Sequence, residues 1–247
     1  MTVIELKDKV ALVTGSARRV GKAIALELAR HGMHQIIHHS NSDKEAEVTV
    51  AEVRALGVEA TIVKADLSQP ADIQRLFDET RQHFGRLDVL VNSASTFKPG
   101  DLLTLPLEEW QETLNVNLTA PLLCSQHAAR LMRETGNGGA IINILDISAL
   151  KPWKQYPAHS VSKSALLTLT EALAQNLGPD IRVNAIAPGP ILRDEGNSPE
   201  QWERIGKQLL LAHTGDPADV VQAVVFLATQ PFITGTTLRV DGGDYLK

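Results

Sequence analysis

The sequence predicts a doubly wound α/β fold, in which about seven parallel strands form one sheet with helices on both faces. Short apolar segments recur along the 247 residues, and helical patterns separate most of them. The first of these segments runs directly into a glycine-containing turn that opens a helix. Repeated strand and helix units of this kind give right-handed crossovers, and ligands bind at the carboxyl ends of the strands.

Each predicted strand is an apolar run that ends in a turn or a polar residue. In chain order they are KVALVTG (9–15), QIIHH (35–39), EATIVKADL (59–67), LDVLVNSAS (87–95), AIINILD (140–146), IRVNAIAPG (181–189) and TLRVDGG (237–243). With 43% hydrophobic residues, the chain can bury one sizeable core, so we expect a single domain over residues 1–247.

A long irregular stretch near the C-terminus, residues 188–200, precedes a helical pattern at 201–213. Loops of this length in compact domains are usually functional, which predicts a substrate lid around residues 188–212. We expect its acidic side chains, Asp194, Glu195 and Glu200, to be solvated.

Composition excludes several classes of partner. A formal charge of -5 without basic clusters argues against nucleic acid, and no apolar run reaches membrane-spanning length. The start, MTVIELKDK, lacks the apolar core of a signal peptide, so we expect a cytoplasmic protein with a small-molecule substrate. The one cysteine, Cys124, is expected to be an inert thiol on a packed helix. The neighbours His38 and His39 point to opposite sides of a strand, so no metal site is predicted.

The first strand-to-helix turn, residues 14–25, reads TGSARRVGKAIA. A glycine turn at a helix N-terminus lets backbone N–H groups and the helix dipole meet a pyrophosphate, although an ordinary strand-to-helix turn has the same pattern. The predicted cofactor-binding residues of this turn are Gly15, Ser16, Arg18, Arg19, Val20 and Gly21.

The end of the second strand predicts the choice of nucleotide. In proteins that bind NAD, an Asp or Glu at this position accepts a hydrogen bond from the ribose 2'-OH. Here the residues at this position are His39, Ser40, Asn41 and Ser42. Without a carboxylate to repel a phosphate, NADP is expected as the cofactor. Arg18 can reach the 2'-phosphate together with the hydroxyls of Ser40 and Ser42.

The stretch from Ile141 to Ala165 combines three groups that suit catalysis. Asp146 follows a buried strand, where a parallel sheet would open into a cleft. A helical pattern begins at about Gln155, and His159 and Lys163, four residues apart, share one face of that helix. A lone helix histidine is usually exposed or capping, but the flanking Asp146 and Lys163 favour an imidazole that lines a site. A lysine there can hold a cofactor ribose and bias the acidity of its neighbour.

These segments together resemble the short-chain dehydrogenase/reductases over about 240 residues. The family's Thr-Gly-x-x-x-Gly-x-Gly motif keeps Gly15 and Gly21, and its active-site lysine is Lys163, whereas His159 replaces its tyrosine and Asp146 its serine. The resemblance implies a Rossmann-like fold that binds a nicotinamide nucleotide. It also implies that Asn117 supports a water-linked proton relay to the lysine. The further cofactor contacts that it implies are Asp66, Leu67, Asn92, Ser93, Ala94, Pro188, Gly189 and Ile191.

A narrower resemblance to pteridine reductases accounts for the departures from the family pattern. Those enzymes carry an Arg at the middle glycine, an Asn-x-Ala-Ser-x-Phe segment and an Asp for the Ser, matched here by Arg19, NSASTF and Asp146. This resemblance implies hydride transfer from NADPH to a C=N bond of a pterin-type heterocycle, a dihydropteridine or dihydrofolate, in a homotetramer. The tetramer would be built on the helices holding Asn117 and Lys163 and on the C-terminal strand. The implied substrate-binding residues are Arg19, Ser95, Phe97, Asp146 and His159, with Phe97 stacked on the pterin.

Two other functions fit the same sequence. One is a carbonyl reductase of the broader family, and the other is a dinucleotide-binding protein without catalysis, because the family's tyrosine is missing. Retention of Asp146, Lys163 and Asn117 favours catalysis. Tyr156, three residues before His159, is an alternative proton source.

Overall fold

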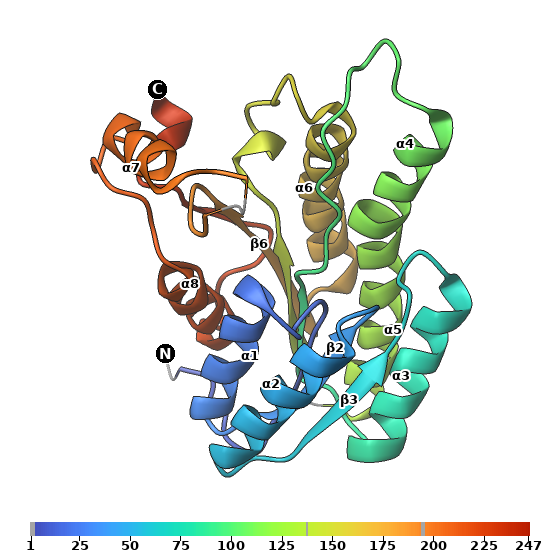
Figure 1. Ribbon diagram of the computed structural model, residues 1–247. Helices are drawn as coiled ribbons and strands as arrows, with labels where there is room; N and C mark the ends of the chain where they lie inside the picture. Colours follow the sequence, from blue (N-terminus) through green and yellow to red (C-terminus); the bar gives the residue numbers. More distant parts are fainter. Residues whose placement is uncertain (1–2, 137, 194–195) are drawn as a thin grey trace.

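A computed structural model describes residues 3–136, 138–193 and 196–247. Its centre is one parallel sheet of seven strands in the order β3-β2-β1-β4-β5-β6-β7 (Figure 1). The doubly wound fold is therefore confirmed, and each predicted strand segment overlaps one strand. The strands are β1 (Val10–Val13), β2 (His34–His39), β3 (Ala60–Lys64), β4 (Val89–Asn92), β5 (Gly139–Ile144), β6 (Ile181–Pro188) and β7 (Thr237–Val240).

Helices cover both faces of the sheet (Figure 1). One face carries α1 (Arg19–Arg30), α2 (Asp43–Ala55) and α8 (Pro217–Thr229). The other carries α3 (Pro70–Phe84), α5 (Ala120–Glu134) and α6 (Pro157–Leu177), with α4 (Leu107–Leu114) leading into α5 through a π-helical turn at Asn115–Thr119. The remaining elements are α7 (Pro199–Gln208) and short 3-10 turns at Ile147–Ala149 and Asp244–Leu246.

Alternation along the strands divides the core into two layers. In β1, Ala11 and Val13 pack under α1, α2 and α8, whereas Val10 and Leu12 pack under α3 and α5. Successive side chains of a strand point to opposite faces, so a strand covered on both sides is apolar throughout. The order of the strands turns between β1 and β4, and this opens a crevice at their carboxyl ends where a ligand can bind.

The predicted helix at 201–213 is wrong in its extent. Helix α7 begins earlier, at Pro199, because Ser198 caps it in a reciprocal capping box with Gln201. It ends at Gln208, since Leu209 is extended with ψ 156° and Ala212 has a left-handed φ of 59°. Glu200 is exposed as predicted, and Asp194 and Glu195 lie outside the described residues.

Cys124 is fully buried in α5, and burial raises the pKa of its thiol to about 12, which confirms an inert cysteine. Within the described ranges, the structure contains no helix that is both long and apolar enough to cross a membrane.

Candidate active site

Asp146 and His159 are in direct contact. Asp146 follows β5, and its Oδ1 accepts a hydrogen bond from the backbone of Ser148 at 2.7 Å, which caps the 3-10 turn. His159 lies in the first turn of α6, which begins at Pro157. The distance from His159 Nε2 to Asp146 Oδ2 is 2.5 Å, and the two side chains are 4% and 18% exposed. The structure thus joins the carboxylate and the imidazole that the sequence placed thirteen residues apart.

The second ring nitrogen of His159 faces a backbone carbonyl. Its Nδ1 lies 3.0 Å from the oxygen of Thr96, in the loop after β4. The buried amide of Asn117 holds Thr96 from both sides: Oδ1 accepts from the Thr96 N–H at 2.8 Å, and Nδ2 donates to its oxygen at 3.0 Å. Nδ2 also donates to Ser162 at 3.1 Å. Sequence reasoning missed Thr96, because a contact through the backbone leaves no side-chain signal. It also missed Ser162, whose hydroxyl contacts Asn117 from 45 residues away along the chain.

Lys163 is buried beside this pair. Its ammonium donates to the carbonyl oxygen of Ile144 at 2.8 Å. Burial lowers the pKa of Lys163, although the charge of Asp146 opposes the shift. Burial alone would raise the pKa of Asp146, but the hydrogen bond with His159 and the charge of Lys163 outweigh it, so this pKa is lowered. Asp146 is therefore ionised at neutral pH.

Aromatic side chains form the wall next to His159. Phe97 stacks on Tyr156, with ring centroids 4.0 Å apart and an angle of 12° between the ring planes. It also meets the ring of His159 edge-on, with centroids 4.8 Å apart. Trp153 contacts the same cluster from the loop before α6. Phe97 is still 40% exposed, so this aromatic wall is open to solvent. The sequence predicted Phe97 for the site but placed neither Trp153 nor the ring of Tyr156 against it.

The glycine turn after β1 has the backbone that its motif predicts. Gly15 has φ 69°, and a Cβ there would lie 3.1 Å from the Cα of Ala94. Arg19 stands at the family's middle glycine and keeps a left-handed φ of 55°, a conformation that costs a side chain roughly 1–2 kcal/mol. Helix α1 starts here without a side-chain cap on Arg18, which leaves its first N–H groups facing the crevice.

His38 fixes this turn to the neighbouring strands. Its Nδ1 accepts from the Gly15 N–H at 2.9 Å, and its Nε2 lies 3.1 Å from the carbonyl oxygen of Ala65. The Ser16 hydroxyl accepts from the His38 N–H at 3.0 Å. Both ring nitrogens are thus used inside the fold. Within the described part of the chain, no group of three or more His, Cys, Asp or Glu side chains could hold a metal ion.

His38 should make the protein sensitive to acid. Burial lowers its pKa from 6.5 to about 4, although the hydrogen bond to Ala65 opposes the shift. Between pH 6.5 and about 4 the unfolded chain protonates this imidazole and the folded protein does not. The free energy of unfolding should therefore fall by about 3 kcal/mol as the pH drops through that window. Denaturant unfolding at several pH values measures this, and His38→Gln should flatten the slope. The exposed His31→Gln is the control, and equal slopes in all three proteins would contradict the assignment.

The remaining predicted cofactor residues border the same crevice. At the end of β2, the Ser42 N–H donates to His39 Nδ1 at 3.2 Å, and Ser40 and Asn41 are exposed. Burial lowers the pKa of His39, with Asp43 opposing the shift, so that its ring is neutral at pH 7. Asp43, the first residue of α2, is paired with Lys64 at 2.9 Å.

Several predicted residues support the strand ends through hydrogen bonds of their side chains or backbone. The Asn92 amide donates to Asn143 at 2.8 Å, whereas the N–H groups of Ser93 and Ala94 donate to Thr14 Oγ1 at 2.9 and 3.0 Å. The rest are distributed around the crevice. Asp66 Oδ1 accepts a hydrogen bond from Ser68 N at 2.9 Å, and the Ser95 hydroxyl donates to Asn117 at 3.1 Å. Leu67 and Ile191 are buried, and Val20 packs against the core. Next to Pro188, the Gly189 N–H donates to the carbonyl oxygen of Val240, and Gly21 lies against Gly15.

These residues fit a nicotinamide nucleotide. The uncapped start of α1 offers N–H donors for a pyrophosphate. Among the described residues, Lys163 donates one hydrogen bond, to the carbonyl oxygen of Ile144 at 2.8 Å. An ammonium has three hydrogens, so donors are left for ribose hydroxyls. Beside Asp146, the buried Ser148 hydroxyl has no hydrogen-bond partner among the described residues, which suits a site that a ligand completes.

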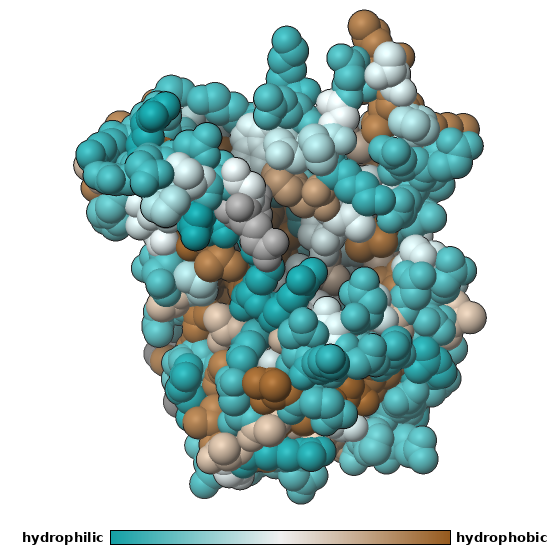
Figure 2. All heavy atoms as spheres, viewed as in Figure 1, coloured by the Kyte–Doolittle hydropathy of each residue, from teal (hydrophilic) through white to brown (hydrophobic). Residues whose placement is uncertain are grey.

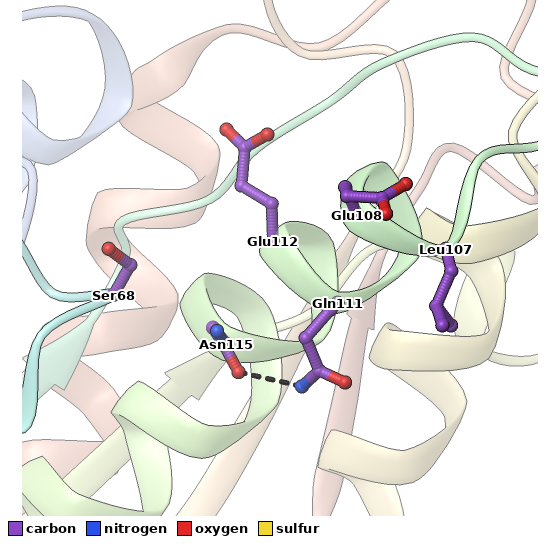
Figure 3. Close-up of a pocket in the computed structure, with 6 residues that line it drawn as sticks. All are labelled: Ser68, Leu107, Glu108, Gln111, Glu112 and Asn115. Carbon is purple, nitrogen blue, oxygen red and sulfur yellow. Dashed lines mark hydrogen bonds between the residues drawn. The ribbon is translucent and has the colours of Figure 1, made fainter.

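A further pocket lies between α4 and the loop after β3. Figure 3 shows it lined by Ser68, Leu107, Glu108, Gln111, Glu112 and Asn115, with a hydrogen bond of 2.9 Å between Gln111 and Asn115. Its lining is acidic and carries no basic side chain within the described residues, which does not suit a nucleotide phosphate. The candidate active site is instead the cluster around Asp146 and His159.

Known proteins resemble this chain over almost its whole length. A family model described as enoyl-(acyl carrier protein) reductase matches residues 15–244. A 3-oxoacyl-[acyl-carrier-protein] reductase from Synechocystis is 37% identical over 96% of this chain and 97% of that protein. An L-rhamnose 1-dehydrogenase (NAD(P)(+)) from Azotobacter vinelandii is 37% identical over 98% of each. The structure of acetoin dehydrogenase YohF from Salmonella typhimurium has a TM-score of 0.89 at 34% identity and 97% coverage of both chains. The chain therefore belongs to the short-chain dehydrogenase/reductase family of oxidoreductases.

Proposed function

We propose that the protein is an NADPH-dependent reductase in which the pair formed by Asp146 and His159 supplies the proton. The observation that carries this proposal is the 2.5 Å contact between His159 Nε2 and Asp146 Oδ2 at the carboxyl end of β5. A contact of this length requires a proton between the two atoms, because two bare acceptors would repel each other. The pair therefore holds a proton next to the crevice.

Reduction of a double bond needs a hydride and a proton. The nicotinamide supplies the hydride when it is bound, and the protein must orient it, exclude water and deliver the proton. In this proposal Lys163 binds the ribose and keeps the site electropositive. Asp146 contacts the substrate and passes the proton, and His159 stores it.

For the substrate we propose a planar heterocycle of the pterin class, reduced at a C=N bond. The partly exposed ring of Phe97, beside His159, can stack on a flat ligand. A carboxylate suits a heterocycle that presents neighbouring N–H groups. Ketones are the second candidate class, because the similar proteins named above include a 3-oxoacyl reductase and an acetoin dehydrogenase.

The test is a screen of NADPH oxidation with dihydropterins, dihydrofolate, quinonoid dihydropterin and simple ketones. Turnover of the pterin group with weak ketone turnover is the expected result. Turnover of ketones alone would favour the second candidate class. Tight NADPH binding without turnover of any compound would favour a dinucleotide-binding protein without catalysis.

Phe97→Ala should weaken substrate binding selectively. Losing one aromatic stack costs about 1–3 kcal/mol, so the KM for the pterin should rise by about 5- to 150-fold. The dissociation constant for NADPH should stay nearly unchanged. Phe226→Ala is a matched control, because that ring is 44% exposed on α8. Equal losses of substrate and cofactor binding would contradict the stacking role.

NADPH should bind more tightly than NADH, and Arg18 should account for much of the difference. Hydrogen bonds to charged groups contribute about 1.5–3 kcal/mol, so Arg18→Gln should weaken NADPH binding by about 10- to 100-fold with little change for NADH. Fluorescence titration measures both. Arg30→Gln, at the other end of α1 and paired with Glu27, is the control. Tighter binding of NADH to the wild type would refute the choice of cofactor.

We also infer a homotetramer and a substrate lid at residues 188–212. Figure 2 shows apolar surface over the loop before α4, where Leu102 and Leu103 are 67% and 94% exposed, and Leu107 on α4 is 71% exposed. Contact between copies of the chain would cover such residues. Sedimentation velocity measures the assembly, and a monomer at micromolar concentration would contradict it.

A further inference from the structure

Both ring nitrogens of His159 are held by acceptors. Nδ1 lies 3.0 Å from the carbonyl oxygen of Thr96, and Nε2 lies 2.5 Å from Asp146 Oδ2. A backbone carbonyl can only accept, so Nδ1 must carry a hydrogen. The movable proton of the pair then lies between Nε2 and Asp146.

Asn117 is the other group close to Nδ1, at 3.3 Å from its Nδ2. The Ser162 hydroxyl donates to the His159 carbonyl at 2.7 Å, so it accepts from Asn117 Nδ2 at 3.1 Å. The second hydrogen of Nδ2 goes to the Thr96 oxygen at 3.0 Å. The amide has two hydrogens, and both are now assigned. Asn117 therefore positions the carbonyl and does not donate to the ring.

We propose that Asn117 is a positioning residue that, by clamping Thr96, locks His159 in its Nδ1–H form, so that the proton leaves the pair only through Asp146. This inference rests on the proposed function for its catalytic part. The proton that His159 Nε2 holds moves to Asp146 Oδ2, which leaves a neutral imidazole that keeps its Nδ1–H. The new Oδ2–H bond then breaks as a bond between that proton and the substrate nitrogen or oxygen forms, so that Asp146 is again a carboxylate. The substrate gains its two electrons with the hydride from the nicotinamide.

The tautomer can be read directly from the protein without substrate or cofactor. Histidine labelled with ¹⁵N reports which ring nitrogen is protonated, and the His159→Gln variant identifies the His159 signals among those of 8 histidines. We expect a protonated Nδ1 in the wild type at every pH at which the protein is folded. An unprotonated Nδ1 would overturn the proposal. This spectrum decides the tautomer even if no Asn117 variant folds.

A matched pair of variants tests the role of Asn117. Asn184 is equally buried, and its amide clamps a backbone in the same manner, donating to Ile233 O at 3.0 Å and accepting from Thr236 N at 3.1 Å. Asn117→Ala should lose the fixed Nδ1 proton at alkaline pH, once the pair has given up its movable proton, and should lower kcat by about 10- to 100-fold, with NADPH affinity changed by less than about threefold. Asn184→Ala should keep both the proton and the rate.

The outcomes separate this inference from the proposed function. An Asn117→Ala protein with the wild-type Nδ1 signal and the wild-type kcat would overturn the positioning role. If no heterocycle or ketone is reduced, the proposed function fails, but the wild-type spectrum still decides the tautomer.

Discussion

Replacing Asp146 by asparagine is expected to lower kcat by about 10²- to 10⁴-fold, the usual loss when a general acid is removed. Asparagine keeps Oδ1, so the hydrogen bond from the Ser148 N–H at 2.7 Å and the 3-10 turn should survive. Its amide N–H would face His159 Nε2 as a donor, and this converts the imidazole to a neutral acceptor. The pair would then hold no proton that it can deliver. Steady-state kinetics at saturating NADPH measure the loss.

The control for this variant is Asp216→Asn. Asp216 caps α8 through the same kind of bond, from Ala218 N to Oδ1 at 2.8 Å. This change should leave kcat within about threefold of the wild type, because a cap exchanged between Asp and Asn keeps its acceptor. Full activity of Asp146→Asn, with His159→Ala also fully active, would remove both residues from the mechanism and leave Tyr156 or a bound water as the proton source.

Lys163→Met should have the second largest effect. If the buried ammonium binds the ribose, its loss should weaken NADPH binding by about 10- to 100-fold, the cost of losing charged hydrogen bonds. The charge of Lys163 helps to lower the pKa of Asp146. Removing it should raise that pKa, so the pair should keep its proton to higher pH. In a plot of kcat against pH, the alkaline limb should therefore shift to higher pH.

Titration with NADPH and rates between about pH 4.5 and 8.5 measure both effects. Lys151→Met is the control, because this exposed lysine follows the same 3-10 turn and donates to the Lys247 carbonyl at 2.8 Å. A Lys163→Met protein that binds NADPH as the wild type does would exclude the ribose contact. A shift of the alkaline limb to lower pH would mean that Lys163 does not help the pair formed by Asp146 and His159 to lose its proton.

Local patterns in the sequence were sufficient for the strands and for the approximate place of each candidate group. The apolar run at 140–146 predicts a buried strand followed by Asp146, and the four-residue spacing places His159 and Lys163 on one helix face. The order of the strands and the end of α7 at Gln208 depend on contacts between distant segments. The segment LLLAH, residues 209–213, continues the helical period of α7 in the sequence. In the structure Leu209 has an extended backbone, and its side chain packs against Gly242 near the C-terminus.

For the site, the sequence by itself determined which functional groups this protein has, namely the carboxylate of Asp146, the imidazole of His159 and the ammonium of Lys163. The tertiary structure alone decided how they are connected. The Thr96 carbonyl that holds His159 Nδ1 is 63 residues away along the chain, and it belongs to the backbone, which every residue type shares. Likewise, Phe97 stacks on Tyr156 because the loop after β4 meets the start of α6. Side-chain chemistry is written in the sequence, whereas hydrogen-bond partners and ring contacts depend on which distant backbone the fold brings within about 3–5 Å.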